Sequence, residues 1–137
     1  MPEYNSFTEA RKNLKDVLDA ADQGGVATIH RPHADAAVVD AQQLRRTLAT
    51  LIPPGAHLVA DGANEWAMFL TDYPIAGSGL TPEEATSDLI EALREYSDDW
   101  LNRLRHAPNH RANWGLVQLI ALSSDADLES WLSGTQS

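Results

Sequence analysis

The run Pro53-Pro54-Gly55 restricts the possible folds of this sequence more than any other feature. Proline fixes φ and lacks a backbone N–H, and glycine favours a turn, so no helix or strand can continue through this run. It divides a chain of 137 residues into two short parts, each large enough for only one small hydrophobic core. We therefore expect two small domains, residues 1–52 and 56–137.

The composition is typical of an ordered protein, with 43% hydrophobic and 22% charged residues. No cysteine is present, which excludes disulfide bonds, thiolate metal ligands and a cysteine nucleophile. No apolar run approaches the roughly 20 residues that a membrane-spanning helix needs. The first residues also lack the basic and apolar segments of a signal peptide. We expect a cytoplasmic protein without a membrane partner.

Charge is distributed unevenly along the chain. Residues 1–50 contain six Lys or Arg and seven Asp or Glu, which gives a net charge of −1. Residues 51–137 contain four Arg and thirteen Asp or Glu, which gives −9. This asymmetry suggests two parts with different partners. Charge alone leaves open whether a basic helix face in the first part binds nucleic acid or is only a solvated surface.

Residues 6–22 have the pattern of a helix with one apolar and one basic side. Ser6 and Glu9 have the spacing of a capping box, in which both side chains accept hydrogen bonds from free amides at the helix start. The helix is expected to begin near Phe7 and to end near Asp22, before Gly24-Gly25. The expected apolar positions are Ala10, Leu14, Val17, Leu18 and Ala21, and the expected basic ones are Arg11, Lys12 and Lys15.

The rest of the first half predicts a short strand before this helix, a hairpin after it and a second helix. The strand is expected within residues 4–7, and the hairpin strands at residues 26–31 and 36–39. Asp40 is expected to cap the second helix, which continues to about Leu51.

The second half predicts another α+β unit. Its expected elements are strands at residues 58–59 and 66–70, a loop at 72–80, a long helix capped by Thr81 and ending near Arg105, and helices at 114–122 and 128–132. All four tryptophans lie in this half. We expect Trp100 and Trp114 in its core, and we consider Trp66 and Trp131 candidates for facing a partner protein.

No residue pattern in the chain predicts catalysis. Gly77-Ser78-Gly79 has the wrong glycine spacing for a nucleophile elbow and is too short for a phosphate loop, so a plain loop is expected. His106 and His110 have the spacing of helical zinc ligands, but Pro108 lies between them and a solvated loop is favoured. The carboxylates that a metal-dependent nuclease could use, Asp61, Asp72 and Asp88, fit turn or exposed helix positions equally well. No catalytic residue, metal or cofactor is expected.

Residues 3–50 resemble the Phd/YefM (prevent-host-death) antitoxins of bacterial type II toxin–antitoxin systems. The resemblance rests on Ala10-Arg11-x-Asn13-Leu14, on a strand that ends Ile29-His30-Arg31, and on the strand Ala36-Ala37-Val38-Val39. It implies a β-α-β-β-α module that forms an intertwined dimer, binds operator DNA and represses its own operon. It also implies DNA contacts by Arg11 and Arg31. Lys12 and Lys15 are added as candidate DNA-binding residues from the helix pattern.

Residues 56–96 are similar to the HicB antitoxin domain, a non-catalytic ribonuclease H-like α+β unit. The similarity lies in Trp66–Phe69, in Asp72-Tyr73-Pro74 with Gly77, and in Thr81-x-Glu83-Glu84-Ala85. A HicB-like unit usually precedes its DNA-binding segment, whereas the expected DNA-binding module comes first here. The acidity of this half suits a basic partner such as an RNA-cleaving toxin.

Three functional hypotheses follow from the sequence. The first is an antitoxin that represses its operon as a homodimer or higher oligomer and neutralises a cognate toxin. The second is a solitary DNA-binding regulator with a fused dimerising or ligand-sensing domain. The third is a ribonuclease H-like hydrolase, which the missing carboxylate constellation disfavours. In the first hypothesis, Arg11 and Arg31 contribute to one DNA-binding surface, and Leu14 anchors the core beneath it.

Overall fold

The computed structural model describes residues 1–134, and the α+β class predicted from the sequence is confirmed. The chain forms two compact units, Met1–Arg46 and Thr47–Ser137. The division falls within helix α3 (Ala41–Leu51). Asp40 caps this helix as expected, because its Oδ1 accepts a hydrogen bond from the Gln43 N–H at 2.9 Å.

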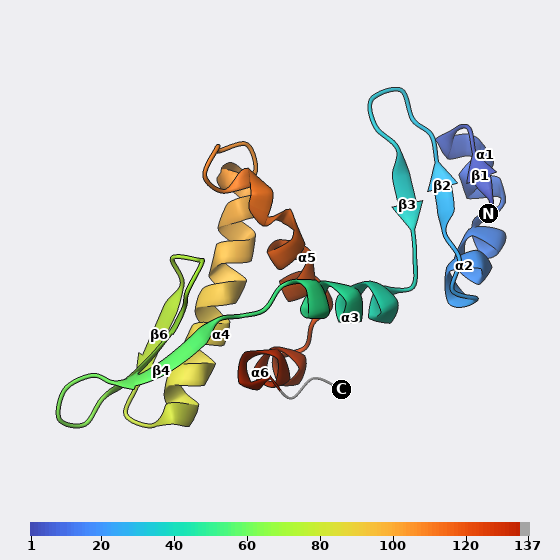
Figure 1. Ribbon diagram of the computed structural model, residues 1–137. Helices are drawn as coiled ribbons and strands as arrows, with labels where there is room; N and C mark the ends of the chain where they lie inside the picture. Colours follow the sequence, from blue (N-terminus) through green and yellow to red (C-terminus); the bar gives the residue numbers. More distant parts are fainter. Residues whose placement is uncertain (135–137) are drawn as a thin grey trace. The chain divides into compact units, whose positions relative to one another are not determined.

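The first unit is a three-stranded sheet with two short helices beside it (Figure 1). Strand β2 lies in the middle, parallel to β1 and antiparallel to β3, so the predicted hairpin is confirmed. The small core consists of Tyr4, Ala10, Val17 and Ala27. The elements are β1 (Glu3–Tyr4), α1 (Phe7–Lys12), α2 (Leu14–Asp22), β2 (Ala27–Ile29) and β3 (Ala36–Val38).

The single helix predicted for residues 7–22 is wrong, because the chain breaks at Asn13 into α1 and α2. Asn13 has φ −114° and ψ 29°, outside the helical region. Its Nδ2 donates to the Glu9 carbonyl at 2.9 Å, and its N–H donates to the Ala10 carbonyl at 3.1 Å. These bonds replace part of the helical ladder, as asparagine side chains commonly do. Ser6 caps α1 as predicted, but Glu9 accepts from the N–H of Asn5 rather than from that of Ser6.

The break also changes which apolar side chains are buried. Val17 and Ala21 of α2 are buried, whereas Leu14 is 55% and Leu18 is 54% exposed. The sheet has only two- and three-residue strands, so it covers one narrow face of the helix. Within a single chain, the expectation that Leu14 anchors the core is therefore wrong.

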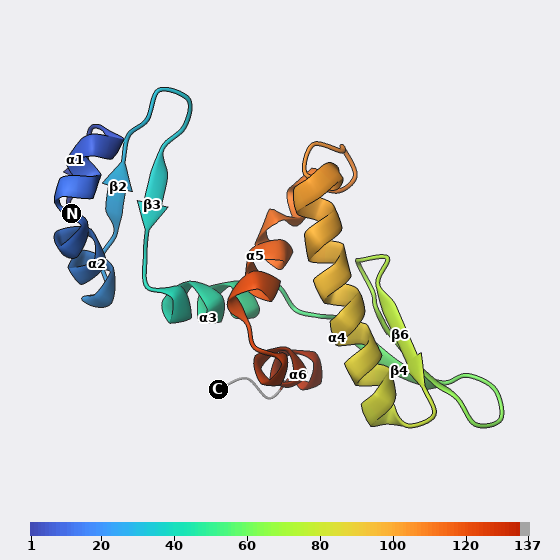
Figure 2. The same cartoon turned by 180° about the vertical axis from the view of Figure 1, so that it is seen from behind.

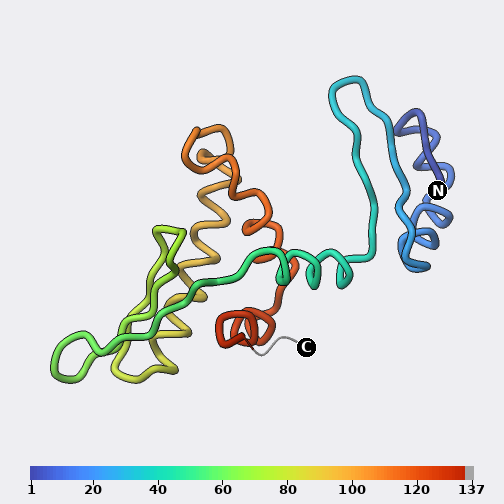
Figure 3. Tube along the Cα trace, viewed as in Figure 1, coloured from blue at the N-terminus to red at the C-terminus, as the bar shows by residue number. Residues whose placement is uncertain are grey.

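The second unit is an antiparallel sheet of order β4-β5-β6 with the long helix α4 along one face (Figure 2). A π-helical turn extends α4, and the chain then folds back into α5 and α6 (Figure 3). The elements are β4 (Ala56–Ala60), β5 (Trp66–Leu70), β6 (Ala76–Gly79), α4 (Pro82–Asp99), η1 (Trp100–Leu104), the 3-10 turn η2 (Arg111–Asn113), α5 (Trp114–Leu122) and α6 (Asp125–Ser133).

The loop predicted for residues 72–80 is wrong, because Ala76–Gly79 form strand β6. Two glycines let α4 lie directly on this strand. A Cβ on Gly77 would overlap the Leu89 backbone and come within 2.8 Å of the Ala85 carbonyl oxygen. A Cβ on Gly79 would come within 2.8 Å of the Ala85 nitrogen. The glycines that suggested a loop instead allow a close contact between helix and strand.

The tryptophans differ from the sequence prediction in two cases. Trp100 is buried as predicted, but Trp114 is 53% exposed. Trp131, considered a partner-facing residue, is only 1% exposed. Its indole N–H donates to the Ile52 carbonyl at 2.8 Å and joins α6 to the segment after α3. An apolar pattern at helical spacing predicts which side of a helix packs, but it does not predict which part of that side another helix covers. For this reason the pattern did not predict the exposure of Trp114 or the burial of Trp131.

The contact between α4 and β6 predicts that Gly77→Ala lowers the free energy of unfolding of the second unit by about 3 kcal/mol, because backbone atoms must move apart. Urea denaturation followed by tryptophan fluorescence reports this unit alone, since all four tryptophans lie in it. Ser78→Ala, at an exposed position of the same strand, is the control and should change stability little. Equal stability of Gly77→Ala and the wild type would contradict the close contact.

Candidate functional site

Two of the four predicted DNA-binding residues are neighbours in the last turn of α1. Arg11 and Lys12 are both exposed, and both lie where a cation stabilises the negative end of a helix dipole. The sequence pattern placed Lys15 on the same face, but the break at Asn13 moves it to the first turn of α2. The structure therefore keeps Arg11 and Lys12 together and removes the helical relation to Lys15.

Lys15 is also engaged by an acidic side chain. Its Nζ lies 2.7 Å from Asp19 Oδ2, one turn further along α2. This hydrogen bond and the charge of Asp19 raise the pKa of Lys15 above its ordinary value. Lys15 remains exposed and cationic, but a nearby carboxylate weakens the attraction it can offer a phosphate.

Arg31 lies just after β2, beside the opposite end of α1. It lines a shallow hollow of about 490 Å³ together with Asn5, Ser6 and Phe7. Because α1 has six residues and a helix rises about 1.5 Å per residue, the first and last residues of α1 are roughly 7.5 Å apart along the helix axis. The candidate residues thus occupy both ends of α1.

His30 is a further candidate, which no sequence pattern indicated. Its Nδ1 lies 3.0 Å from Asp35 Oδ1, and its Nε2 lies 3.5 Å from Glu3 Oε1. The hydrogen bond to Asp35, followed by the charge of Asp35 and the bond to Glu3, raises the pKa of His30 above 6.5. Protonated His30 places a second cation beside Arg31. The parallel pairing of β1 with β2, which brings Glu3 alongside, has no local sequence signal.

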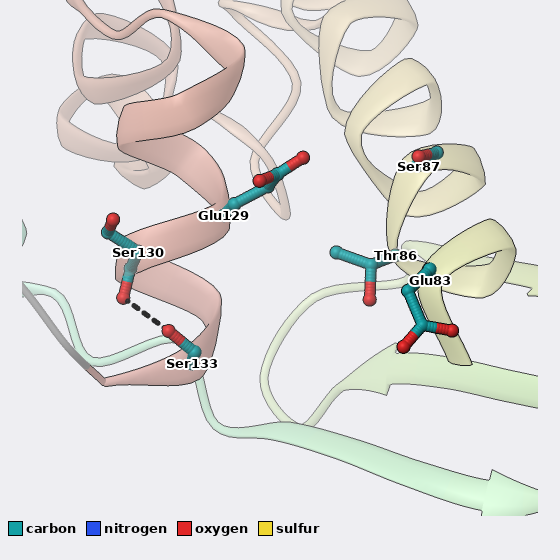
Figure 4. Close-up of a pocket in the computed structure, with 6 residues that line it drawn as sticks. All are labelled: Glu83, Thr86, Ser87, Glu129, Ser130 and Ser133. Carbon is teal, nitrogen blue, oxygen red and sulfur yellow. Dashed lines mark hydrogen bonds between the residues drawn. The ribbon is translucent and has the colours of Figure 1, made fainter.

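In the second unit, a polar groove of about 410 Å³ lies between α4 and α6 (Figure 4). Figure 4 shows Glu129 and Thr86 projecting into the space between the helices, and the Ser133 hydroxyl donating to the Ser130 carbonyl at 3.1 Å. The other lining residues are Glu83 and Ser87. Hydroxyl groups and two carboxylates can hold a cationic side chain, but they form no nucleophile–base pair.

The carboxylates considered for metal-dependent hydrolysis are not assembled into a site. Asp88 accepts a hydrogen bond from the Ser78 N–H at 2.9 Å, which fixes it beside β6. Asp61 lies in the turn after β4, and Asp72 follows β5. Within residues 1–134, no group of three or more His, Asp or Glu is placed to hold a metal ion. His110, predicted in a solvated loop, is half-buried, with its Nδ1 2.9 Å from the Tyr96 hydroxyl.

The first unit has exposed cations, and the second unit carries a net charge of −9. The chain belongs to the PHD-like family described as "antitoxin of toxin-antitoxin, RelE / RelB, TA system", which matches residues 1–131. It is therefore an antitoxin, a class that points to a non-enzymatic regulatory protein with a cognate toxin as partner.

A crystal structure from Syntrophomonas wolfei subsp. wolfei has a similar fold, with a TM-score of 0.73 and 21% sequence identity. The alignment covers 97% of this chain and 95% of that one, which is described as the antitoxin part of a suggested toxin/antitoxin system. No curated protein sequence matches this chain significantly. In the part of the chain that the structure describes, no helix is long and apolar enough to cross a membrane.

The contacts of His30 predict that Asp35→Asn moves its pKa down toward 6.5, because the mutation removes the largest cause of the upward shift. A raised pKa in the folded state stabilises the fold below pH 6.5, and this contribution disappears as the pH rises through the folded pKa. An NMR titration of the His30 ring measures the shift. Asp22→Asn, the same charge change elsewhere in the first unit, is the control. An equal titration of His30 in both variants would contradict the pairing.

Proposed function

We propose that this antitoxin binds operator DNA as a dimer through its first unit, represses its own operon and neutralises its toxin through its second unit. The exposed cations at both ends of α1, Arg11 and Lys12 at one end and Arg31 at the other, support the DNA-binding part most directly. Arginine and lysine contribute phosphate contacts, and an arginine can also recognise guanine in the major groove.

The overall charge of the first unit is compatible with this role. Residues 1–46 carry six basic and seven acidic side chains. Several of the acidic ones are engaged locally, since Asp19 pairs with Lys15, and Asp35 and Glu3 contact His30. Arg11, Lys12 and Arg31 have no hydrogen-bonded acidic partner among the described residues. They are the cations most available to phosphate.

Dimerisation is supported by apolar side chains that the first unit leaves exposed. Leu14 and Leu18 lie one turn apart on α2, so they form one continuous patch. Phe7 of α1 is 64% exposed. A dimer would bury such residues and present two copies of the cationic surface to two half-sites on DNA.

Toxin neutralisation by the second unit is supported by charge. The unit carries four arginines and thirteen Asp or Glu, a net charge of −9. Such a surface attracts a basic protein, and proteins that cleave RNA need a positive surface for their substrate. An RNA-cleaving toxin is therefore the proposed partner.

This proposal predicts that Arg11→Ala and Arg31→Ala each weaken binding to the DNA upstream of the protein's own gene about tenfold or more. Lys15→Ala should have a smaller effect, because Asp19 already engages this lysine. Fluorescence anisotropy at several salt concentrations measures the affinity and the number of phosphate contacts.

Arg105→Ala is the matched control for this experiment, because it removes one exposed positive charge from the second unit. Wild-type affinity of both Arg11→Ala and Arg31→Ala would reject the proposed DNA surface. Loss of affinity in Arg105→Ala to the same degree would show that net charge, not position, determines binding.

The exposed patch on α2 predicts that the double variant Leu14→Lys/Leu18→Lys dissociates the dimer, because charges on a buried interface are strongly unfavourable. Sedimentation velocity of the full chain measures the change. Leu101→Lys, at a 51% exposed position of the second unit, is the control and should leave the dimer intact. A double variant that remains dimeric would place the interface elsewhere.

A further inference from the structure

The two outer edges of the β4-β5-β6 sheet differ. The N–H of Leu70 in β5 bonds to the Ile75 carbonyl, which fixes the alternation of hydrogen bonds between β5 and β6. The backbone groups of Gly77 and Gly79 therefore point toward β5, and the N–H groups of Ser78 and Leu80 point outward. Both are occupied by carboxylates of α4: Ser78 donates to Asp88 at 2.9 Å and Leu80 to Glu84 at 2.8 Å. The edge at β6 is therefore closed to another strand.

The edge at β4 is open within residues 1–134. The N–H of Asp61 bonds to the Glu65 carbonyl, and the N–H of Thr71 bonds to the Gly55 carbonyl. The backbone N–H and C=O groups of the odd-numbered residues of β4 therefore point toward β5, and those of the even-numbered residues point outward. These outward residues are Ala56, Leu58 and Ala60, and the described chain supplies β4 with β5 as its only neighbouring strand.

Strand β4 also lacks the features that usually protect an edge. It contains no proline or Lys, Arg, Asp or Glu, and it pairs with β5 in five successive positions without a bulge. Leu58 is 40% exposed and Val59 is 43% exposed. The sheet face opposite α4 is open as well, and Phe69 on it stacks against His57 with ring centroids 5.2 Å apart. An apolar, uncapped edge of this kind can accept a further strand.

The charges around β4 determine which strand fits. Asp61 and Glu65 lie in the turn at one end of β4. Asp72 lies at the other end, directly after Thr71, whose N–H bonds to the Gly55 carbonyl. All three are exposed. A second copy of this chain would bring its own carboxylates to both ends, together with the net charge of −9 of its second unit. A strand with Lys or Arg at its ends would instead find an opposite charge at each end.

We propose that the outer edge of β4 is the toxin-docking surface, and that it adds a strand of the toxin with an apolar middle and basic ends. This inference rests on the proposed neutralisation of a toxin by the second unit. Backbone hydrogen bonds to Ala56, Leu58 and Ala60 supply the pairing, while Leu58, Val59 and the carboxylates at the strand ends select the sequence.

The test uses the full chain co-expressed with the protein encoded beside it. Ala60→Pro removes one outward N–H but no hydrogen bond to β5, and it should reduce co-purification at least tenfold. Ala60→Ser keeps the N–H and should bind like the wild type. Asp61→Asn/Asp72→Asn should weaken binding in a salt-dependent manner, whereas Asp98→Asn, which removes one charge from α4, should not. Hydrogen exchange should show protection of residues 56–60 in the complex.

The outcomes separate this inference from the proposed function. If the wild type binds the neighbouring protein but Ala60→Pro binds equally well and residues 56–60 gain no protection, the β4 edge is not the docking surface. If the wild type itself does not bind that protein, neutralisation by the second unit is rejected together with this inference. If residues 56–60 are protected in the free chain in a concentration-dependent manner, the occupant is a second copy and the toxin assignment is wrong. Tryptophan fluorescence of Ala60→Pro confirms that the second unit remains folded.

Discussion

The second unit depends on the direct contact between helix α4 and strand β6. A helix normally rests on a sheet through side chains, but Gly77 and Gly79 let the backbone of α4 approach β6 closely. This approach brings Glu84 and Asp88 within hydrogen-bonding distance of the outward amides of β6. One contact therefore positions the helix against which α5 and α6 pack, and it also closes one edge of the sheet. The difference between the two edges is a consequence of those two glycines.

The stability of the first unit is limited, because its core is very small. Four buried residues, with Ala20, Ile29 and Val38 packed against them, form the core cluster. A domain of this size buries too little apolar surface to be stable without further support. Leu14 and Leu18, which the broken helix leaves exposed, provide apolar surface that association can bury. Association would thus bury this apolar surface and also bring together two copies of the proposed DNA-binding surface.

The sequence predicted those features that depend on local chemistry. The caps at Ser6, Asp40 and Thr81 are present, because a capping side chain bonds to amides three residues away. The strand at Gly77 and the exposure of Trp114 could not be predicted, since both depend on what packs against them from distant parts of the chain. The candidate site shows the same division: Arg11, Lys12 and Arg31 are recognisable as cations, but the pairing of His30 with Glu3 requires β1 to lie parallel to β2.

Net charge does not by itself identify where on this chain a partner binds, because many of its carboxylates have structural roles. Glu9, Asp40, Glu84 and Asp127 accept hydrogen bonds at helix starts, Asp88 closes β6, and Asp125 pairs with Arg94. An acidic side chain held in this way is partly neutralised by the groups that bind it. In contrast, Asp61, Glu65 and Asp72 make no side-chain hydrogen bond or ion pair within residues 1–134 and surround the open strand β4. Because carboxylates without a structural role retain their full attraction for cations, those at this edge can contribute to the choice of a partner strand.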